Sequence, residues 1–487
     1  MSKLVIEKIN DVYIKVHCEP DIAYELNDYF TFTVPGAKFI PSVRNKFWDG
    51  KIRLFNAATR RIYAGLKLHL EIFARERNYE VDYLDPNQFA QEQFSIEEAQ
   101  DYAKYISINI PPRDYQLEAF THAIRSKRAV LLSPTASGKS LIIYMLSRWY
   151  NQNADRVLIV VPTTSLVHQM ASDFMEYGLP SQDSVHKIFS GQEKDTGAAF
   201  VITTWQSIYK MPKQWFEQFS TVIGDEAHLF KAKSLTGIMD KLVNCPHRFG
   251  FTGTLDGTQT HKLVLEGLFG PVKKVTTTAE LIEKKHLSDF KIKAICLSYS
   301  DETRQRVKAY TYQDEIDFIV TNDDRNKFIV NLVKSLKGNS LLLYQFVEKQ
   351  GKPLYNMVQS VSDNVYYVSG DVDGVIREDI RQAVEQSDNA IIVASFGTFS
   401  TGVNIKNLHN VIFASPSKSR IRNLQSIGRG LRKGNNKTSA TLYDISDDLS
   451  WKSRKNHTLL HFAERIKIYN EEKFDYKIYT VKLKETC

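Results

Sequence analysis

Short apolar runs alternate with longer polar segments along most of the chain. In the first half, apolar or β-branched runs occupy residues 129–132, 157–161, 201–204 and 221–223. In the second half they occupy residues 341–344, 365–368, 390–393 and 410–413. Continuous apolar runs of this length are typical of buried strands in parallel sheets, and the segments between them have helix-compatible composition. The pattern therefore predicts an α/β protein with two parallel sheets built of βαβ units.

With 487 residues the chain is long enough for about three domains. The two predicted sheets use most of it and leave roughly 100 residues before the first sheet. We therefore predict a small α+β domain at 1–100, a first parallel-sheet lobe at 101–283, a second lobe at 284–450 and a helical tail at 451–487.

The segment after the first strand has the composition of a phosphate-binding loop. It ends in Gly-Lys-Ser at 138–140, and the helix-compatible run 141–146 follows directly. A strand–loop–helix unit presents backbone amides and a helix N-terminus to an anionic phosphate. Lys139 is expected to reach the β and γ phosphates of a nucleotide, and the Ser140 hydroxyl to bind Mg²⁺. The residues expected to form the cradle are Pro134, Thr135, Ala136, Ser137, Gly138, Lys139 and Ser140.

An acidic pair follows the strand predicted at 221–223. Asp225 and Glu226 come just after the carboxyl end of that strand, which is the edge where ligands bind in open parallel sheets. Mg²⁺ keeps several waters and takes few carboxylates, so Asp225 suits Mg²⁺ binding partly through water. Glu226 can polarise the attacking water. Together with the loop, this pair predicts a hydrolase of magnesium–nucleotide complexes.

The series of motifs resembles that of the superfamily 2 helicases and translocases. The resemblance covers residues 111–444, about two-thirds of the chain. It implies two tandem RecA-like lobes, with ATP and Mg²⁺ as cofactors and ATP bound between the lobes. Arg113 and Gln116 precede the loop by about twenty residues, where the family reads adenine. The Gln116 amide can donate to and accept from an adenine edge.

Two hydroxyl-rich turns follow the next strands. Thr163 and Thr164 come after the strand at 157–161, and Thr204 ends the strand at 201–204. In the family these turns face nucleic acid, and hydroxyl groups are good phosphate ligands. The same side chains can also cap the helices that follow, and both roles can hold at once. The segment 251–254 resembles the family motif that couples hydrolysis to movement.

The second predicted lobe has no phosphate loop and is expected to supply catalytic groups. Arg429 and Arg432 are three residues apart, hence neighbours on one helix face. Two guanidiniums there can stabilise the transferring phosphoryl group, an effect of about 10³–10⁵ in rate for arginine fingers. The resemblance implies this role, and it also places Gly402 and Asn404 at the nucleotide. Many family members carry Asp where Asn404 stands.

Positive charge is concentrated near the amino terminus. The whole chain has a net charge of +8, but residues 38–77 contain ten basic and three acidic side chains, a net of +7. Residues 1–35 have a net charge of −3. We predict that the basic segment binds nucleic-acid phosphates. The basic residues expected to contact nucleic acid are Arg44, Lys46, Lys51, Arg53, Arg60 and Arg61.

Aromatic residues are interleaved with these charges. Phe47 and Trp48 precede Asp49-Gly50, a turn dipeptide that predicts a hairpin over 46–55. One ring of this hairpin can stack on a base. In the alternative, which we favour for Trp48, the rings belong to the core of the small domain.

The sequence lacks a membrane-length apolar run and the features of a signal peptide. We therefore expect an intracellular protein that is not secreted and has no membrane partner. Over its whole length the chain also closely resembles a phage recombination helicase, which implies that it acts in the cytoplasm of a bacterial host. That resemblance implies ATP-driven unwinding, branch migration and annealing of branched DNA and R-loops in recombination, repair and replication restart. Three alternatives stay open: an RNA helicase, a restriction-type DNA translocase, and a non-catalytic annealing protein with a relic ATP site.

Overall fold

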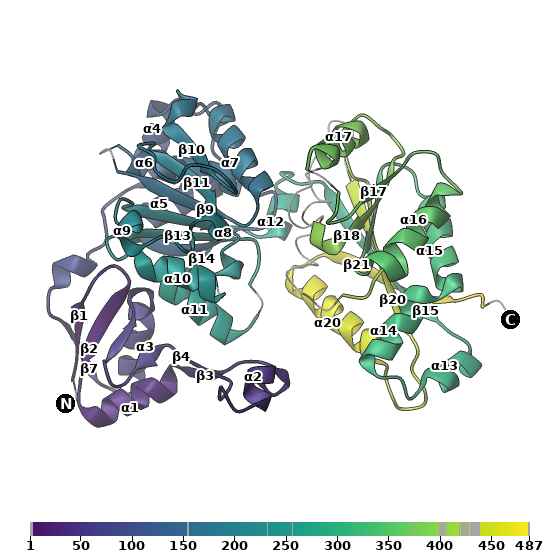
Figure 1. Cartoon of the computed structure of the whole chain (residues 1–487), viewed down its shortest axis with the longest axis horizontal. Coiled ribbons are helices and arrows are strands. Elements are labelled where there is room, and N and C mark those ends of the chain that lie inside the picture. Colours follow the sequence, from purple (N-terminus) through teal and green to yellow (C-terminus); the bar gives the residue numbers. More distant parts are fainter. Residues whose placement is uncertain are drawn as a thin grey trace. The chain divides into compact units, whose positions relative to one another are not determined.

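The structure, a computed structural model, describes residues 3–485 except 153–154, 231, 256, 373, 399–404, 406, 418, 420–427 and 429–438. The chain divides into two compact units. One comprises Met1–Ser133 and Gly138–Val275, and the other comprises Pro134–Ser137 and Thr276–Cys487. Each contains a seven-stranded sheet with helices on its faces, and the first also contains a small amino-terminal domain (Figure 1).

The sheet of the first unit has the strand order β10-β11-β9-β12-β13-β8-β14, and all of its strand pairs are parallel. Its strands are β8 (Arg128–Leu132), β9 (Val157–Val161), β10 (Val185–Ile188), β11 (Phe200–Thr204), β12 (Thr221–Asp225), β13 (His247–Thr252) and β14 (Val272–Lys274). The four strands predicted in this half are thus confirmed as β8, β9, β11 and β12. Each is buried along most of its length, which explains its continuous apolar sequence.

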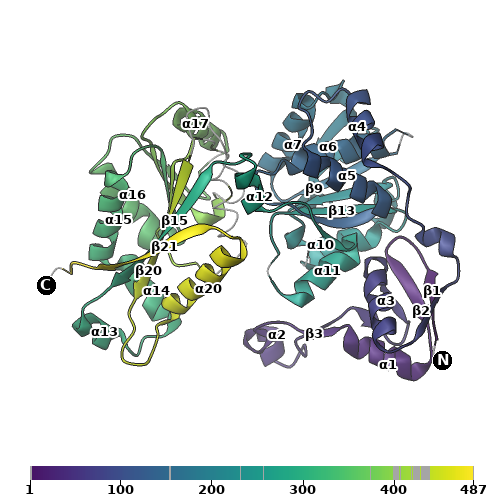
Figure 2. The same cartoon turned by 180° about the vertical axis from the view of Figure 1, so that it is seen from behind.

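Helices cover both faces of this sheet (Figure 1 and Figure 2). One face carries α4 (Ile96–Tyr105), α5 (Asp114–Ser126), α6 (Lys139–Tyr150) and α7 (Thr164–Glu176). The other carries α8 (Trp205–Ile208), α9 (Lys213–Phe216), α10 (Lys233–Lys241) and α11 (Gln259–Phe269). Successive residues of a strand point to opposite faces, so Ala129 and Leu131 pack against the first set and Val130 against the second.

The sheet of the second unit has the order β17-β18-β16-β19-β20-β15-β21, again with parallel pairs. Its strands are β15 (Asp289–Ser298), β16 (Ser340–Tyr344), β17 (Val365–Val368), β18 (Ile391–Ser395), β19 (Asn410–Phe413), β20 (Ser439–Asp448) and β21 (Asp475–Lys482). Its helices are α12 (Thr278–Glu283), α13 (Asp301–Val307), α14 (Tyr312–Thr321), α15 (Asp323–Ser335), α16 (Lys352–Gln359), α17 (Gly374–Glu385) and α20 (His457–Glu471). The four predicted strands correspond to β16 to β19, so the predicted fold class of two tandem parallel-sheet lobes is confirmed.

The segment after residue 451 is not purely helical, which corrects the prediction of a helical tail. Helix α20 is followed by strand β21, which pairs in parallel with β15 at the edge of the sheet. Most residues of β21 are exposed, so the strand lacks the apolar run that marks a buried strand. Among the residues with described positions, no helix has the length and apolar character needed to cross a bilayer.

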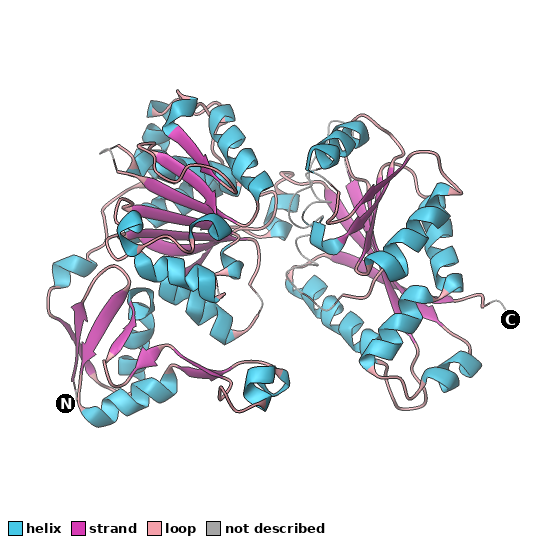
Figure 3. Ribbon diagram, viewed as in Figure 1, coloured by secondary structure: helices cyan, strands magenta, loops and turns pink. Residues whose placement is uncertain are grey.

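The amino-terminal domain is a mixed α+β domain, as predicted. Its five-stranded sheet has the order β5-β6-β2-β1-β7, and a separate two-stranded ribbon pairs β3 with β4. The strands are β1 (Lys3–Lys8), β2 (Tyr13–His17), β3 (Thr31–Thr33), β4 (Lys51–Arg53), β5 (Phe55–Asn56), β6 (Arg61–Tyr63) and β7 (Glu80–Tyr83). The helices are α1 (Pro20–Tyr29), α2 (Pro41–Arg44) and α3 (Lys67–Glu76). The ribbon with α2 at its end extends away from the five-stranded sheet (Figure 3).

The predicted hairpin over 46–55 is wrong. Strand β4 pairs with β3, twenty residues earlier in the chain, and α2 lies in the connection between them. The Asp49 carboxylate accepts a hydrogen bond from the Lys51 N–H (3.0 Å). The turn is therefore stabilised by the Asp49 side chain, and the residues on its two sides do not pair as strands. Phe47 is 86% exposed, and Trp48 is half-buried outside the domain's apolar core. The interpretation of these rings as core residues is therefore wrong as well.

The amino-terminal domain packs against the first parallel sheet through α11. Gly65 approaches this helix so closely that a Cβ there would lie 2.0 Å from the Glu266 carbonyl oxygen. His69 Nε2 lies 2.7 Å from the Glu266 carboxylate, and Tyr13 donates to the Asp240 carboxylate of α10 (3.2 Å). Only glycine fits at position 65, so the docking geometry depends on that residue.

Candidate functional site

The loop 133–138 connects β8 to α6 at the carboxyl edge of the first sheet. The Ser133 N–H donates to the Thr252 carbonyl of the neighbouring strand β13 (2.9 Å). Ala136 (φ +67°) and Gly138 (φ +77°) have left-handed backbone, and α6 begins at Lys139. Left-handed residues in such a loop direct successive amides toward one point and form an anion-binding concavity at a helix N-terminus. The backbone thus has the shape that the predicted phosphate cradle requires.

Gln116 holds this loop in place. Its Nε2 donates to the Gly138 carbonyl (3.1 Å), and its Oε1 accepts from the Arg113 N–H (2.8 Å). Glycine is favoured at position 138 by its left-handed φ of +77°, and a Cβ there would also lie 2.4 Å from the Gln116 amide nitrogen and displace that side chain. The sequence did not indicate this positioning contact. The adenine contact of Arg113 and Gln116 stays a prediction.

The acidic pair lies at the same edge of the sheet as the loop. Strand β12 ends at Asp225, and only β13 separates β12 from β8. The Asp225 Oδ1 atom is shielded from solvent and has no hydrogen-bond partner within the described part of the chain. Burial and the neighbouring Glu226 carboxylate raise the pKa of Asp225 to about 6, and the Lys139 ammonium acts in the opposite direction. A bound cation would compensate this buried charge, so the Asp225 carboxylate fits Mg²⁺, and Ser140, which follows Lys139, has the hydroxyl oxygen that such an ion also accepts.

Glu226 has a strained backbone of the kind found at functional sites. Its φ of +52° lies in the left-handed region, which is uncommon for residues other than glycine. The Glu226 carboxylate lies 3.2 Å from His228 Nδ1, and that nitrogen lies 3.1 Å from Thr252 Oγ1. Thr252 therefore connects the predicted coupling segment to the acidic pair. His261 of α11 also supports the motif, because its Nε2 donates to the His228 carbonyl (2.9 Å).

The hydroxyl group of Ser140 has a partner that sequence analysis missed. Ser140 Oγ lies 2.7 Å from the hydroxyl of Tyr177, the residue that follows α7. Burial raises the pKa of Tyr177 to about 12, so this phenol is neutral at physiological pH. Beside it, Lys139 Nζ donates to the Ser133 carbonyl across the loop (3.4 Å).

The hydroxyl-rich turns were predicted to cap helices and to contact nucleic acid, and one of them caps a helix. The Thr163 side chain caps α7 by accepting from the Leu166 N–H (3.4 Å). Thr204 is buried, and its hydroxyl lies 2.9 Å from that of Ser207 within α8. Thr164 is exposed. The capping role is therefore seen for Thr163, and contact with nucleic acid stays a prediction for all three threonines.

The predicted basic surface is divided between two places in the amino-terminal domain. The first comprises four exposed residues on α2, the β3–β4 ribbon and the turn before it: Arg44, Lys46, Lys51 and Arg53. Of these, Arg53 is paired with Asp49 (2.5 Å). The second lies by the five-stranded sheet, where Arg60 and Arg61 line a pocket of about 520 Å³. Lys15 and His17 of β2 line the same pocket, and the sequence did not indicate them because they are forty residues away.

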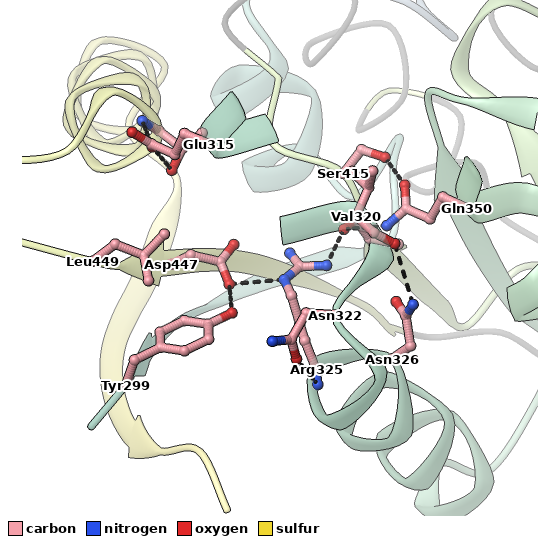
Figure 4. Close-up of polar contacts among 12 residues, drawn as sticks. Tyr299, Glu315, Val320, Asn322, Arg325, Asn326, Gln350, Ser415, Asp447 and Leu449 are labelled. Carbon is pink, nitrogen blue, oxygen red and sulfur yellow. Dashed lines mark hydrogen bonds and ion pairs between the residues drawn. The ribbon is translucent and has the colours of Figure 1, made fainter. Parts of the chain in front are cut away.

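The predicted catalytic and nucleotide-contacting residues of the second lobe lie outside the described residues. These residues are Arg429, Arg432, Gly402 and Asn404. Two buried ion pairs stabilise the described segments that flank these residues in the sequence. Arg325 Nε lies 2.7 Å from the Asp447 carboxylate, and Arg325 Nη1 donates to the Ala414 carbonyl after β19 (Figure 4). A second buried pair joins Arg465 and Asp444 at 2.8 Å.

Two tandem parallel sheets of this topology, with a phosphate-type loop and an acidic pair on the first, define a RecA-like ATPase of the helicase and translocase class. Residues 109–257 match the family described as "Type III restriction enzyme, res subunit", and residues 6–85 match "DNA helicase UvsW, N-terminal". The chain is 37% identical to the ATP-dependent DNA helicase uvsW of Enterobacteria phage T4, over 97% of this chain and 98% of that protein. The chain belongs to the UvsW family of helicases, and its predicted resemblance to a phage recombination helicase is confirmed.

Solved structures and a more distant relative agree with this assignment. The crystal structure of T4 UvsW matches 99% of this chain and 100% of its own, with 35% identity and a TM-score of 0.53. A DNA 3'-5' translocase, XPB2 of Sulfurisphaera tokodaii, is 24% identical over 67% of this chain and 80% of its own length. A putative HsdR subunit of a type I restriction enzyme from Vibrio vulnificus YJ016 shares the fold, at 16% identity and a TM-score of 0.58 over 79% of this chain and 72% of that one.

Proposed function

We propose that this protein is an ATP-dependent DNA helicase and translocase that acts on branched DNA and R-loops, in recombination, repair and replication restart. The observation that carries the proposal is the convergence of an amide-lined loop, Lys139 and a shielded carboxylate at one edge of the first sheet. The T4 relative, named an ATP-dependent DNA helicase, supports DNA as the substrate. We propose the domain bounds 1–100 and 101–283 for the first unit, and a second lobe that begins at 284 and includes residues 451–487, because β21 completes its sheet. We also propose the cytoplasm of the infected host as the site of action.

The first lobe supplies most of the proposed ATP site. Lys139 binds the β and γ phosphates, and Ser140 and Asp225 hold Mg²⁺ partly through water. The ion, when bound, neutralises phosphate charge. Glu226 orients the attacking water and accepts its proton, and the contact with His228 fixes the position of that carboxylate. Proton transfer to such a group contributes about 10²–10⁴ to the rate of hydrolysis.

The second lobe completes the proposed site. Arg429 and Arg432 stabilise charge on the transferring phosphoryl group, and Gly402 and Asn404 contact the nucleotide. Arg113 and Gln116 read the adenine. Closure of the lobes around ATP completes the catalytic set and hydrolysis reopens it, which moves one lobe along the DNA.

Two surfaces of the first unit are proposed to bind DNA. The turns at Thr163, Thr164 and Thr204 contact phosphates of the strand along which the motor moves. The basic residues of the amino-terminal domain form a second contact, whose two parts suit a branched substrate. Contacts of this kind are mainly to phosphates, so we expect weak sequence preference.

The first experiment tests the proposed role of Glu226 in ATP hydrolysis. Glu226→Gln should bind ATP and DNA normally but lose at least about 10²-fold in turnover, because the general base is absent. Glu217→Gln, at an exposed position on the same lobe, is the matched control and should keep full ATPase activity. Normal turnover by Glu226→Gln would contradict the role of this residue. A wild-type protein without ATPase activity would favour the annealing protein with a relic site.

The second experiment tests the substrate. ATPase activity is measured with four-way DNA junctions, forks, linear duplex, single-stranded DNA and RNA at several salt concentrations. We expect the branched DNAs to stimulate most. Strongest stimulation by RNA would favour an RNA helicase, and equal stimulation by linear and branched duplex would favour a restriction-type translocase.

A further inference from the structure

Tyr177 is held rigidly against the proposed ATP site. Its N–H donates to the Asp173 carbonyl (2.9 Å), and its carbonyl accepts from the Asn109 N–H (3.2 Å). Its ring packs against the apolar core of the first lobe, with the Tyr144 ring 5.7 Å away. These contacts fix the ring, so the hydroxyl has a defined position 2.7 Å from Ser140 Oγ.

The chemistry of a metal-binding serine gives this contact a direction. A serine hydroxyl has one proton and two lone pairs. When a lone pair of Ser140 points at Mg²⁺, the proton points away from the ion and needs an acceptor. The Tyr177 oxygen is an acceptor at hydrogen-bonding distance, and a tyrosine phenol is ordinarily neutral at neutral pH. Residues that bind the far side of a metal-binding group orient it in this way.

We propose that Tyr177 is a positioning residue for magnesium–nucleotide binding, which accepts the Ser140 hydroxyl proton and thereby directs a Ser140 lone pair at Mg²⁺. The proposal rests on the proposed function, because it presupposes that Ser140 binds the ion. Loss of such a partner typically reduces metal affinity about 10- to 100-fold. Tyr177 therefore acts on the metal-dependent part of nucleotide affinity and leaves the metal-free part unchanged.

The test variant is Tyr177→Phe, which keeps the ring and removes the acceptor oxygen. The matched control is Tyr144→Phe, which removes a hydroxyl from the same aromatic cluster. The Tyr144 hydroxyl accepts from Arg148 Nη1 (2.7 Å), so its removal affects a different hydrogen bond. Equilibrium binding of fluorescent methylanthraniloyl-ATP is measured on the full-length protein in Mg²⁺ and in EDTA. Thermal unfolding verifies that each variant folds.

We expect Tyr177→Phe to bind the analogue about tenfold more weakly in Mg²⁺ and within twofold of the wild type in EDTA. Tyr144→Phe should match the wild type in both. In a Ser140→Ala background, Tyr177→Phe should have no further effect. Replacement of Tyr177 by 3-fluorotyrosine, which keeps the shape and weakens the acceptor, should give a smaller loss in Mg²⁺ and provides a second variant if phenylalanine impairs folding.

Two outcomes would overturn the proposal: unchanged affinity in Mg²⁺, or an equal loss in Mg²⁺ and EDTA, which would mean that Tyr177 only supports packing of the loop. Failure of the proposed function looks different. In that case the wild type itself would show no gain in nucleotide affinity on addition of Mg²⁺.

Discussion

The buried pair of Arg325 and Asp447 gives a prediction about the stability of the second unit. Both side chains have no exposed surface, and Arg325 Nε lies 2.7 Å from the Asp447 carboxylate. The Tyr299 hydroxyl donates to the same carboxylate oxygen (2.8 Å). Arg325 also donates to the Ala414 carbonyl, so the pair connects β20 to the end of β19 (Figure 4). Asp447→Asn keeps the shape of the side chain and removes its charge.

The expected loss follows from this geometry. Two unit charges separated by 2.7 Å attract each other by about 6 kcal/mol at an effective dielectric constant of about 20. Asparagine recovers part of this energy, because it is less costly to bury than a carboxylate and its oxygen still accepts hydrogen bonds. The remaining loss is dominated by the uncompensated Arg325 charge. We therefore expect Asp447→Asn to lower the free energy of unfolding of the second unit by about 3–5 kcal/mol.

Hydrogen exchange followed by mass spectrometry measures the free energy of unfolding of the second unit separately from that of the first, through peptides of β16, β19 and β20. The control is Asp317→Asn, which removes a partner from the exposed pair with Lys349 (2.9 Å; side chains 37% and 52% exposed) and should cost less than about 1 kcal/mol. A loss of that small size for Asp447→Asn would refute the reasoning, because it would mean that the Arg325 charge is solvated or compensated elsewhere.

Three further predictions concern the first unit. The pKa of Asp225 is raised from 3.8 to about 6, so the folded state binds this proton more tightly than the unfolded state, and stability falls as pH rises from about 4 to 6. At 1.36 kcal/mol per pKa unit, Asp225→Asn should raise the metal-free free energy of unfolding at pH 7 by up to about 3 kcal/mol, and urea titrations at pH 5 and 7 should show a gain about half as large at pH 5. Gly65→Ala should cost about 1–3 kcal/mol and expose the domain junction to protease, whereas Gly197→Ala, with no neighbour within 4 Å, should behave as wild type. Reversing the charges of Arg44 and Lys46 should reduce the log–log salt slope of DNA binding by about one for each phosphate that is no longer neutralised, and an unchanged slope would exclude this surface.

The parallel strands and the order of the motifs were predictable because they depend on local sequence. A strand buried on both faces must be apolar throughout, and the loop before Lys139 and the pair Asp225-Glu226 follow such strands directly. Their meeting at one edge follows from parallel strand direction alone. Strand β21 was not predictable on these grounds, because its exposed edge position leaves most of its residues polar.

The contacts made by Tyr177 and His261 could not be predicted from the sequence. Tyr177 reaches Ser140 across 37 residues, and His261 reaches the His228 carbonyl across 33. Neither belongs to a motif, and each contact depends on how a helix packs on the sheet. The hairpin prediction failed for a local reason, since the Asp49 carboxylate competes for the backbone N–H groups of the turn.

The docking of the amino-terminal domain on α11 has a consequence for how the motor can move. The same helix bonds to the His228 carbonyl through His261 and contacts Gly65 and His69 of the domain through Glu266. These contacts join the amino-terminal domain to the first sheet through α11. We propose that the two move together, so that DNA bound by both would be held at two points with a constant spacing. We expect every forward step to come from the second lobe, with the amino-terminal domain setting the distance at which a DNA branch is presented to the motor.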